Sequence, residues 1–302
     1  MKQYLDLIRD IMAHGTERKD RTGVGTISVF GRQIRFDMRN GFPAITTKAL
    51  AWKNLVAELL WFLEGSTNEH RLAEIKNDNK PYTELTEKER RTIWTANYEC
   101  QGRNLGYENG ELGRIYGKQW TDFRGVKTES FSAGIVHVNQ VKKVIEMIKN
   151  DPWSRRLLVS AWNPAELEYM ALMPCHYAFQ FYVSGERGEY LSLMWNQRSA
   201  DVCLGIPFNI ASYALLLHII AKMTGKIPLE LIGNLGDTHI YLNHLDGALE
   251  QLKREPKKLP ELELPENADY SDIDSFLKSV KTSDFKLKNY EHHPTIKFDM
   301  AV

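Results

Sequence analysis

Cys175 is the residue whose type and neighbours point most directly to chemistry. It lies in a Met-Pro-Cys-His segment, and the chain carries Arg155 and Arg156 before it and Arg198 after it. Cationic neighbours lower the pKa of a cysteine thiol, and the thiolate is a strong nucleophile. Arginine also binds phosphate through bidentate, charge-assisted hydrogen bonds. Together these residues predict covalent chemistry on a phosphorylated small molecule.

His176 follows Cys175 directly, which suggests the Cys-His pair of a hydrolase. Consecutive side chains of a strand point to opposite faces of a sheet, so we expect these two side chains not to share a proton. A hydrolase is therefore not predicted. The alternative for Cys175 is a buried structural cysteine, the commoner role of a lone cysteine. Cys203 and Cys100 are interpreted as structural and surface cysteines.

Glu58 is a further candidate because it lies in Leu-Val-Ala-Glu-Leu-Leu-Trp-Phe-Leu, among apolar residues. Burial raises the pKa of a carboxyl group, which makes Glu58 a candidate for proton transfer near neutral pH. The alternative is a structural carboxylate that pairs with a donor in the core. His239 and Tyr241 are two residues apart on a strand-like segment, so both side chains should face the same side.

Composition limits the classes of protein that this sequence can encode. The chain has 302 residues, 43% of them hydrophobic, and 39 basic residues balance 39 acidic ones. A large core is possible, and no global charge favours nucleic acid or membrane surfaces. The cysteines match no metal-ligand spacing, so no metal is predicted, and they indicate a reduced, cytoplasmic setting. We find no signal peptide, and the apolar stretches look too short and too interrupted to span a bilayer.

Hydrophobic periodicity predicts one α+β domain with no internal repeat. Helices are predicted over residues 2–14, 51–63, 138–149, 208–223 and 241–253. Strands are predicted over residues 26–38, 155–162, 176–184, 190–198, 229–238 and 285–291, with a bulge at Gly31. Residues 69–91 are charged and predict a surface insertion, and residues 255–284 predict a loop-rich region.

Six segments, taken together and in order, resemble the thymidylate synthase family. They are Asp-Arg-Thr-Gly-Val-Gly-Thr at 20–26, Tyr-Gly-Lys-Gln-Trp at 116–120, Pro-Cys-His at 174–176, Gln-Arg-Ser-Ala-Asp at 197–201, Pro-Phe-Asn-Ile-Ala-Ser-Tyr at 207–213 and Gly-Asp-Thr-His-Ile-Tyr at 236–241. No single segment is decisive, but the ordered set spans nearly the whole chain. Insertions near 69–91, 124–136 and 255–284 fall where the family varies.

The resemblance implies reductive methylation of 2′-deoxyuridylate (dUMP) to thymidylate (dTMP). Methylenetetrahydrofolate would donate both the one-carbon unit and the hydride, leaving dihydrofolate. The resemblance also implies a mixed, bulged β-sheet with helices packed on one face. The other face would form the interface of a homodimer, in which each active site borrows arginines from the partner subunit.

By resemblance, most site residues bind the nucleotide. Cys175 would add to carbon 6 of the uracil ring with support from His176, and Glu58 and Tyr116 would take part in proton transfer, Tyr116 having strand packing as its alternative role. The phosphate would be held by Arg21, Arg198 and Ser199 of one subunit and by Arg155 and Arg156 of the other, and the ribose by His239 and Tyr241. Asn209 would read the uracil edge, because an amide can accept from ring nitrogen 3 and donate to oxygen 4. Alternatively, Asn209 could cap a helix that begins near Ile210.

The resemblance assigns a second set of residues to the folate donor. Asp201 would hold the pterin and contribute to both ligand sites, and the rest of the pocket would be formed by Ile93, Trp94, Leu204, Gly205, Phe208, Tyr241 and Ala301. The C-terminal residues 297–302 would close over both ligands and exclude water.

Five positions depart from the family pattern, namely Thr95, Arg114, Thr121, Trp153 and Asn196. None of them removes the nucleophile, a phosphate ligand or the residue that reads uracil. The nearest alternative function is a deoxyuridylate hydroxymethylase, which delivers water in place of hydride; Trp94 and the intact C-terminal tail favour hydride. The alternative from another class is an RNA-binding protein without catalysis. The zero net charge and the absence of a basic stretch interleaved with aromatic residues argue against it.

Overall fold

A six-stranded sheet organises the part of the chain that this computed structural model describes, residues 1–129 and 132–300. The strands follow the order β1 (Thr16–Arg18), β2 (Thr26–Asp37), β8 (Ile227–Tyr241), β7 (Tyr190–Asp201), β6 (His176–Ser184) and β5 (Leu158–Ser160). Neighbouring strands are antiparallel except β7 and β8, which are parallel. The sheet is therefore mixed, as predicted.

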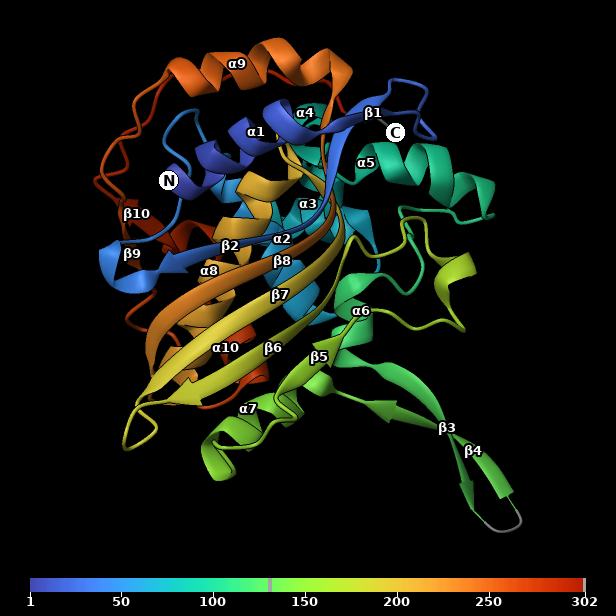
Figure 1. Ribbon diagram of the computed structural model, residues 1–302. Coiled ribbons are helices and arrows are strands. Elements are labelled where there is room, and N and C mark those ends of the chain that lie inside the picture. The colour runs from blue at the N-terminus through green and yellow to red at the C-terminus, as the bar shows by residue number, and fades with distance from the viewer. Residues whose placement is uncertain (130–131, 301–302) are drawn as a thin grey trace.

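Helices cover one face of this sheet, while β6, β7 and β8 are uncovered on the side that faces the viewer in Figure 1. Behind the strands, α8 (Gly205–Met223) packs on β7, β8 and α2 (Trp52–Glu64). At the β2 side, α1 (Lys2–His14) packs on β2, and α9 (Leu245–Lys253) packs on α1. This arrangement is the predicted α+β class.

α8 is apolar on almost every side, which is typical of a helix at the centre of a core. By length and composition alone it could cross a membrane, so the expectation that every apolar stretch is too short for this was wrong. Most of its length is buried inside the protein. Length and composition could not distinguish the two cases, because only the contacts with the sheet show where the apolar surface goes.

The bulges of the sheet do not lie where the sequence predicts one. Gly31 has a left-handed φ of 73°, but β2 keeps the same register with β8 before and after it. The residue opposite is Gly236, which is also unpaired. Each strand therefore has one unpaired residue at this point, whereas a bulge needs an extra residue on one strand only. The register shifts lie elsewhere, between His176 and Ala178 of β6 and within the β7–β8 pair.

Strand β8 continues further than predicted, to Tyr241, and the following helix begins only at Leu245. A 3₁₀ turn at Leu242–His244 (η5) joins the two elements. Ile240 is fully buried, and pairing with β2 continues to Tyr241, the first residue that the sequence assigns to the helix. This extension of β8 places His239 and Tyr241 on one strand, as expected.

The segments 69–91 and 255–284 are more ordered than their composition suggests. The first forms α3 (Glu69–Lys76), η2 (Tyr82–Glu84) and α4 (Glu87–Arg90), and the second forms β9 (Glu261–Glu263), α10 (Ile273–Ser279) and η6 (Thr282–Asp284). Leu72, Ile75 and Phe276 bury their side chains in the core. Both segments therefore contribute side chains to the core. Their helices α3 and α10 bury one apolar face and carry charged residues on the others.

A hairpin that was not predicted protrudes from the body in Figure 1 and is formed by β3 (Phe123–Glu129) and β4 (Ser132–Val138). It occupies the segment where an insertion was expected. The next helix, α7 (Gln140–Asn150), therefore begins later than predicted, and the Asn139 side chain caps it by accepting from the Lys142 amide. The other described elements are η1 (Met38–Asn40), α5 (Thr95–Asn97), η3 (Tyr98–Gly102), α6 (Tyr116–Thr121), η4 (Leu167–Tyr169) and β10 (Lys286–Lys288).

Candidate active site

A cavity of about 680 Å³ lies where the C-terminal ends of β7 and β8 meet the start of α8. It gathers most of the residues that the sequence singled out, although they come from distant parts of the chain. The predicted residues that line it are Arg21, Glu58, Ile93, Trp94, Tyr116, Cys175, His176, Arg198, Ser199, Asp201, Leu204, Gly205, Phe208, Asn209, His239 and Tyr241. Arg155 and Arg156 do not line it, and Ala301 lies outside the described residues.

Cys175 is held by its backbone immediately before β6. Its amide donates to the Tyr116 hydroxyl over 2.7 Å, and its carbonyl accepts from the Arg198 amide over 2.8 Å. Tyr116 begins the helix α6, so the alternative of strand packing was wrong for this residue. Its φ of 24° is strained for a residue with a side chain, and such strain is commonly stored at functional sites.

Burial raises the pKa of the Cys175 thiol, while Arg198, Tyr116 and Arg21 act in the opposite direction. The prediction of a lowered pKa was therefore wrong, because the cost of burying the charged thiolate is larger than its stabilisation by the cations. Among these groups, Arg198 has the largest lowering effect on the pKa of the thiol. Arg198 is positioned by the residues that directly precede Cys175, since its guanidinium donates to the carbonyls of Met173 and Pro174, each over 3.0 Å.

His176 lines the cavity beside Cys175, contrary to the expectation of opposite faces. Cys175 precedes the strand, and the ladder is irregular just after His176, so strict alternation does not apply. The Nδ1 atom of His176 lies 2.7 Å from the Tyr213 hydroxyl, and burial lowers the pKa of the ring to about 3. A ring that stays neutral and is bonded to Tyr213 is a poor base for the thiol, which supports the exclusion of a hydrolase dyad.

Glu58 projects from α2 into the cavity, and its Oε1 accepts a 2.7 Å hydrogen bond from Trp94 Nε1. Burial raises its pKa to about 7, against the smaller effect of the Trp94 hydrogen bond. The predicted rise in pKa is confirmed. A carboxyl group with this pKa exchanges its proton readily at neutral pH, as proton-transfer groups require.

Asn209 lies inside α8, which begins at Gly205, so the alternative of a helix cap was wrong. Asp201 holds the segment just before this helix, because its Oδ1 accepts hydrogen bonds from the amides of Cys203 and Leu204 over 2.9 and 3.2 Å. Among the residues described, the Asn209 amide has no hydrogen-bond partner, although it faces the cavity. Its donor and its acceptor are therefore available to a ligand.

His239 and Tyr241 both face the cavity, with ring centroids 5.2 Å apart. Their common side confirms the prediction from strand alternation. The Nδ1 atom of His239 lies 3.1 Å from Asp237 Oδ1, and Asp237 also accepts hydrogen bonds from Arg18 and Ser28. This network fixes the orientation of the His239 ring at the wall.

A family model described as "Thymidylate synthase" matches residues 2–302. The chain belongs to the thymidylate synthase family. It is 52% identical to "Thymidylate synthase" of Enterobacteria phage T4 and 49% identical to "Probable thymidylate synthase" of Escherichia phage T5, with full coverage of both proteins in each comparison. A crystal structure of thymidylate synthase from T4 phage matches it with a TM-score of 0.87 and 51% identity over the whole of both chains.

Membership of the thymidylate synthase family establishes the reaction class. The protein methylates dUMP to dTMP and uses methylenetetrahydrofolate as co-substrate. None of its five departures from the thymidylate synthase pattern lines the cavity, namely Thr95, Arg114, Thr121, Trp153 and Asn196. Thr95 and Arg114, for example, join local networks: Thr95 donates to the Glu69 carboxylate over 3.1 Å, and Arg114 pairs with Asp122 over 3.0 Å.

Some residues that line the cavity were not predicted from the sequence. Phe62, Asn97 and Leu172 contribute to the wall. Phe62 looks like any apolar residue of a core helix, and only the fold shows that its ring stacks on Tyr116, with centroids 5.0 Å apart. No signal in the sequence distinguishes such a residue from its buried neighbours.

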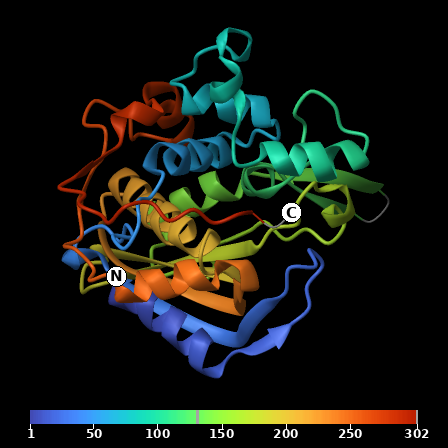
Figure 2. The same cartoon turned by 90° about the horizontal axis from the view of Figure 1, so that it is seen from above.

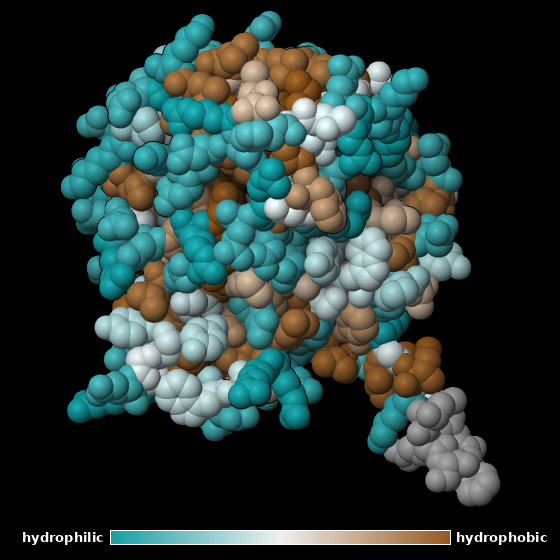
Figure 3. Space-filling model, in the orientation of Figure 1, coloured by the Kyte–Doolittle hydropathy of each residue, from teal (hydrophilic) through white to brown (hydrophobic). Residues whose placement is uncertain are grey.

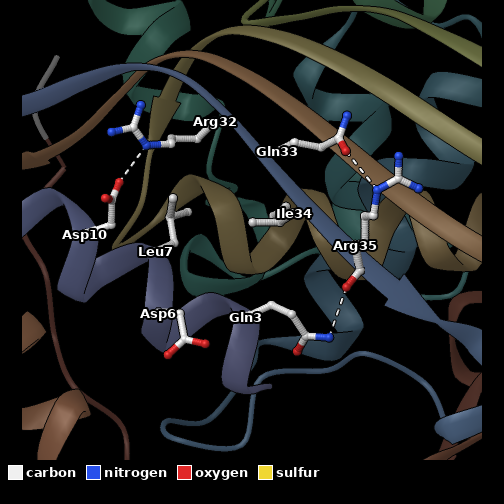
Figure 4. Close-up of a pocket in the computed structure, with 8 residues that line it drawn as sticks. All are labelled: Gln3, Asp6, Leu7, Asp10, Arg32, Gln33, Ile34 and Arg35. Carbon is white, nitrogen blue, oxygen red and sulfur yellow. Dashed lines mark hydrogen bonds and ion pairs between the residues drawn. The ribbon is translucent and has the colours of Figure 1, made fainter.

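A second cavity of about 400 Å³ lies between α1 and β2 (Figure 4). Its polar side chains are already paired: Arg32 Nε donates to Asp10 over 2.6 Å, and Gln3 donates to the Arg35 carbonyl over 2.9 Å. This arrangement stabilises the packing of α1 on the sheet and leaves little for a ligand to bind.

Proposed function

We propose that the protein performs this reaction by adding the Cys175 thiolate to carbon 6 of the uracil ring. Carbon 5 of uracil is too weakly nucleophilic to attack a methylene donor at neutral pH. Addition at carbon 6 turns the ring into an enolate, so that one difficult step becomes two easier ones. The observation that carries the proposal is the position of Cys175 in the cavity, with its backbone held by Tyr116 and Arg198.

The cations beside Cys175 would assist the addition. Since burial raises the pKa of the thiol, Cys175 must give its proton to solvent in the open cavity as the sulfur–carbon bond forms, and Arg198 and Arg21 stabilise the thiolate at that moment. Glu58 and Tyr116 both line the cavity and would exchange protons with the ring during the steps that follow. The folate donor supplies the one-carbon unit and the hydride.

The remaining lining residues fit the two ligands. Asn209 would bond the uracil edge, and His239 and Tyr241 would bond the ribose. Arg21, Arg198 and Ser199 would hold the phosphate. The flat pterin of the donor would lie against Trp94 and the other apolar members of the wall, namely Ile93, Leu204, Gly205 and Phe208, with Asp201 as its polar partner.

The direct test of this function is the product formed from dUMP and methylenetetrahydrofolate. We expect dTMP together with one equivalent of dihydrofolate, measured by mass and by absorbance. With deoxycytidylate in place of dUMP we expect little product, because the Asn209 amide matches uracil. A product one oxygen heavier, without dihydrofolate, would identify a hydroxymethylase; a salt-sensitive shift of an RNA probe with neither product would identify an RNA-binding protein.

The proposal includes a homodimer formed by the uncovered face of the sheet. Leu158 of β5 and Tyr182 of β6 are exposed large hydrophobic residues, and Figure 3 shows apolar and polar side chains mixed across this side. Asn196, Asn234 and Gln33 form a hydrogen-bonded row across three strands of the same face. An open apolar and polar sheet face of this kind is suited to pairing with a second copy.

Arg155 and Arg156 would complete the phosphate site of the partner subunit. Both are exposed, neither lines the cavity of its own chain, and neither side chain has a hydrogen-bond or ion-pair partner among the described residues. Two adjacent cations without local partners are expected to serve a ligand or a second chain.

Subunit complementation tests the shared site. The Cys175→Ala variant and the Arg155→Ala/Arg156→Ala variant should each be nearly inactive alone. Mixed and allowed to exchange subunits, they should recover about a quarter of wild-type activity, because about half of the dimers are hybrids with one intact site. Mixing Cys175→Ala with Glu58→Gln should recover nothing, because both residues line the cavity of their own chain and each site of a hybrid dimer would carry one of the two changes. Absence of recovery in the first mixture would show that the arginines act within their own chain.

A further inference from the structure

The last described residues of the chain lie across the active-site cavity. Figure 2 shows the C-terminal segment, in red, crossing the molecule in the view from above. Phe298 and Met300 contribute side chains to the cavity lining. The segment must therefore be held in a defined position for the cavity to have this shape.

Gly247 gives Phe298 its place on α9. A Cβ atom at Gly247 would lie 2.3 Å from Phe298 Cε1, 2.8 Å from Cζ and 3.1 Å from Ile296 Cγ2. Glycine lowers the stability of a helix relative to alanine, and Gly247 lies within α9, where no turn requires it. The presence of glycine at this position is explained by the Phe298 ring, which packs directly against the backbone and leaves no room for a side chain.

Two further side chains enclose the same ring. The His244 ring meets it at an interplanar angle of 62°, with centroids 4.9 Å apart. Lys48 Nζ lies 4.9 Å from the ring centroid, and it donates a 2.9 Å hydrogen bond to the Cys203 carbonyl. Lys48 is buried, so its cation is held close to the ring rather than free in solvent.

His244 also bonds the backbone of the C-terminal segment. Its Nε2 lies 2.7 Å from the Asp299 carbonyl, so Nε2 carries the proton and donates. The ring is buried, and its centroid lies 5.5 Å from that of Tyr241, a residue of the cavity wall. His244 thus joins the C-terminal segment to the part of the wall assigned above to the ribose.

We propose that Gly247, His244 and Lys48 form a seat for Phe298 that fixes the closed position of the C-terminal segment over the reaction. These are positioning residues, and their effect on the product rests on the function proposed above. With the segment seated, water is kept from the methylene carbon on the covalently bound nucleotide until hydride arrives. If the segment is displaced, water adds its oxygen to that carbon, the sulfur–carbon bond breaks with the electron pair returning to Cys175, and the released proton goes to the thiolate. The product is then hydroxymethyl-deoxyuridylate, and the donor is not oxidised.

The Gly247→Ala variant tests the seat, because its methyl group occupies the position of the Phe298 ring. We expect kcat to fall by about tenfold or more and the hydroxymethyl product to appear, while dUMP affinity changes less than about twofold. Phe298→Ala should cause a similar loss. In the Phe298→Ala background the added methyl group meets no ring, so Gly247→Ala should have no further effect on kcat. Leu249→Ala, on an exposed part of the same helix, is the control and should behave as the wild type.

Two further measurements separate the seat from the chemistry. Carboxypeptidase should remove the C-terminal residues faster from Gly247→Ala than from the wild type, with no substrate needed. His244→Gln, which keeps a donor, should retain more turnover than His244→Phe. Equal digestion rates and an additive double variant would overturn the seat even if dTMP is formed. Absence of dTMP from the wild type, with the digestion rates still different, would overturn only the proposed function.

Discussion

Replacing Cys175 by alanine is expected to lower turnover by at least about 10⁴-fold, the scale of losing a covalent nucleophile. Dissociation of dUMP should change little, because the phosphate, ribose and uracil contacts come from other residues of the cavity. Turnover is measured by dihydrofolate formation, and binding by equilibrium titration with dUMP. Cys100→Ala is the matched control and should retain wild-type turnover, because Cys100 is exposed and does not line the cavity.

Trapping gives the same hypothesis a structural readout. A uracil nucleotide with fluorine at carbon 5 has no proton to lose there, so with the folate donor it should remain bonded to Cys175. The peptide that contains Cys175 should gain the corresponding mass in the wild type and in Cys100→Ala, but not in Cys175→Ala. Label found on another residue, or no label in an active enzyme, would contradict addition by this thiol.

The candidate site was more predictable than the path of the chain around it. Cys175, Glu58 and Asn209 could be assigned because their chemistry and their motifs agree, and the structure brings all three to one cavity. Phe298 and Gly247 could not be paired from the sequence. One is an aromatic residue near a terminus and the other a glycine in a helix, and only their contact in three dimensions connects them.

Errors in the predicted elements have local physical causes. The helix predicted from residue 241 begins later because η5 intervenes at Leu242–His244, and the buried Ile240 keeps β8 paired until Tyr241. The bulge predicted at Gly31 is absent because Gly236 stands opposite, which no single-strand pattern reveals. Periodicity describes one element at a time, whereas both outcomes depend on the neighbouring strand.

The pKa of the Cys175 thiol also depends on neighbouring elements that the local sequence does not show. Counting arginines near Cys175 predicted a lowered pKa, but burial has the larger effect and raises it. For Glu58 the apolar sequence context indicated burial, and the predicted direction was confirmed. Sequence context predicts desolvation well when the neighbours belong to the same helix. It predicts poorly when burial comes from segments such as α6 that are remote in sequence.

Glu58→Gln is expected to lower turnover by about 10² to 10⁴-fold, the usual contribution of a positioned acid or base. The amide keeps the shape of the side chain and can still accept from Trp94, but it cannot exchange a proton. The pH profile of kcat should bend near pH 7 in the wild type, where the Glu58 carboxyl titrates, and this bend should be missing from the variant. Glu69→Gln is the control, because burial also raises the pKa of Glu69 but its side chain lies outside the cavity lining.

The same variant has an effect on stability whose sign can be worked out. The pKa of Glu58 rises from 4.5 to about 7 in the folded chain, so below pH 4.5 the group is protonated in both states and costs nothing. As the pH rises from 4.5 to about 7, the unfolded chain loses this proton while the folded chain keeps it, so the wild type loses stability that Glu58→Gln keeps; above about pH 7 both states are deprotonated and the loss is complete. The difference in melting temperature between variant and wild type should therefore grow in favour of the variant from pH 4.5 to about 7 and stay level above it. A constant difference over this range, or a bend near pH 7 that survives in Glu58→Gln, would show that another group carries the titration.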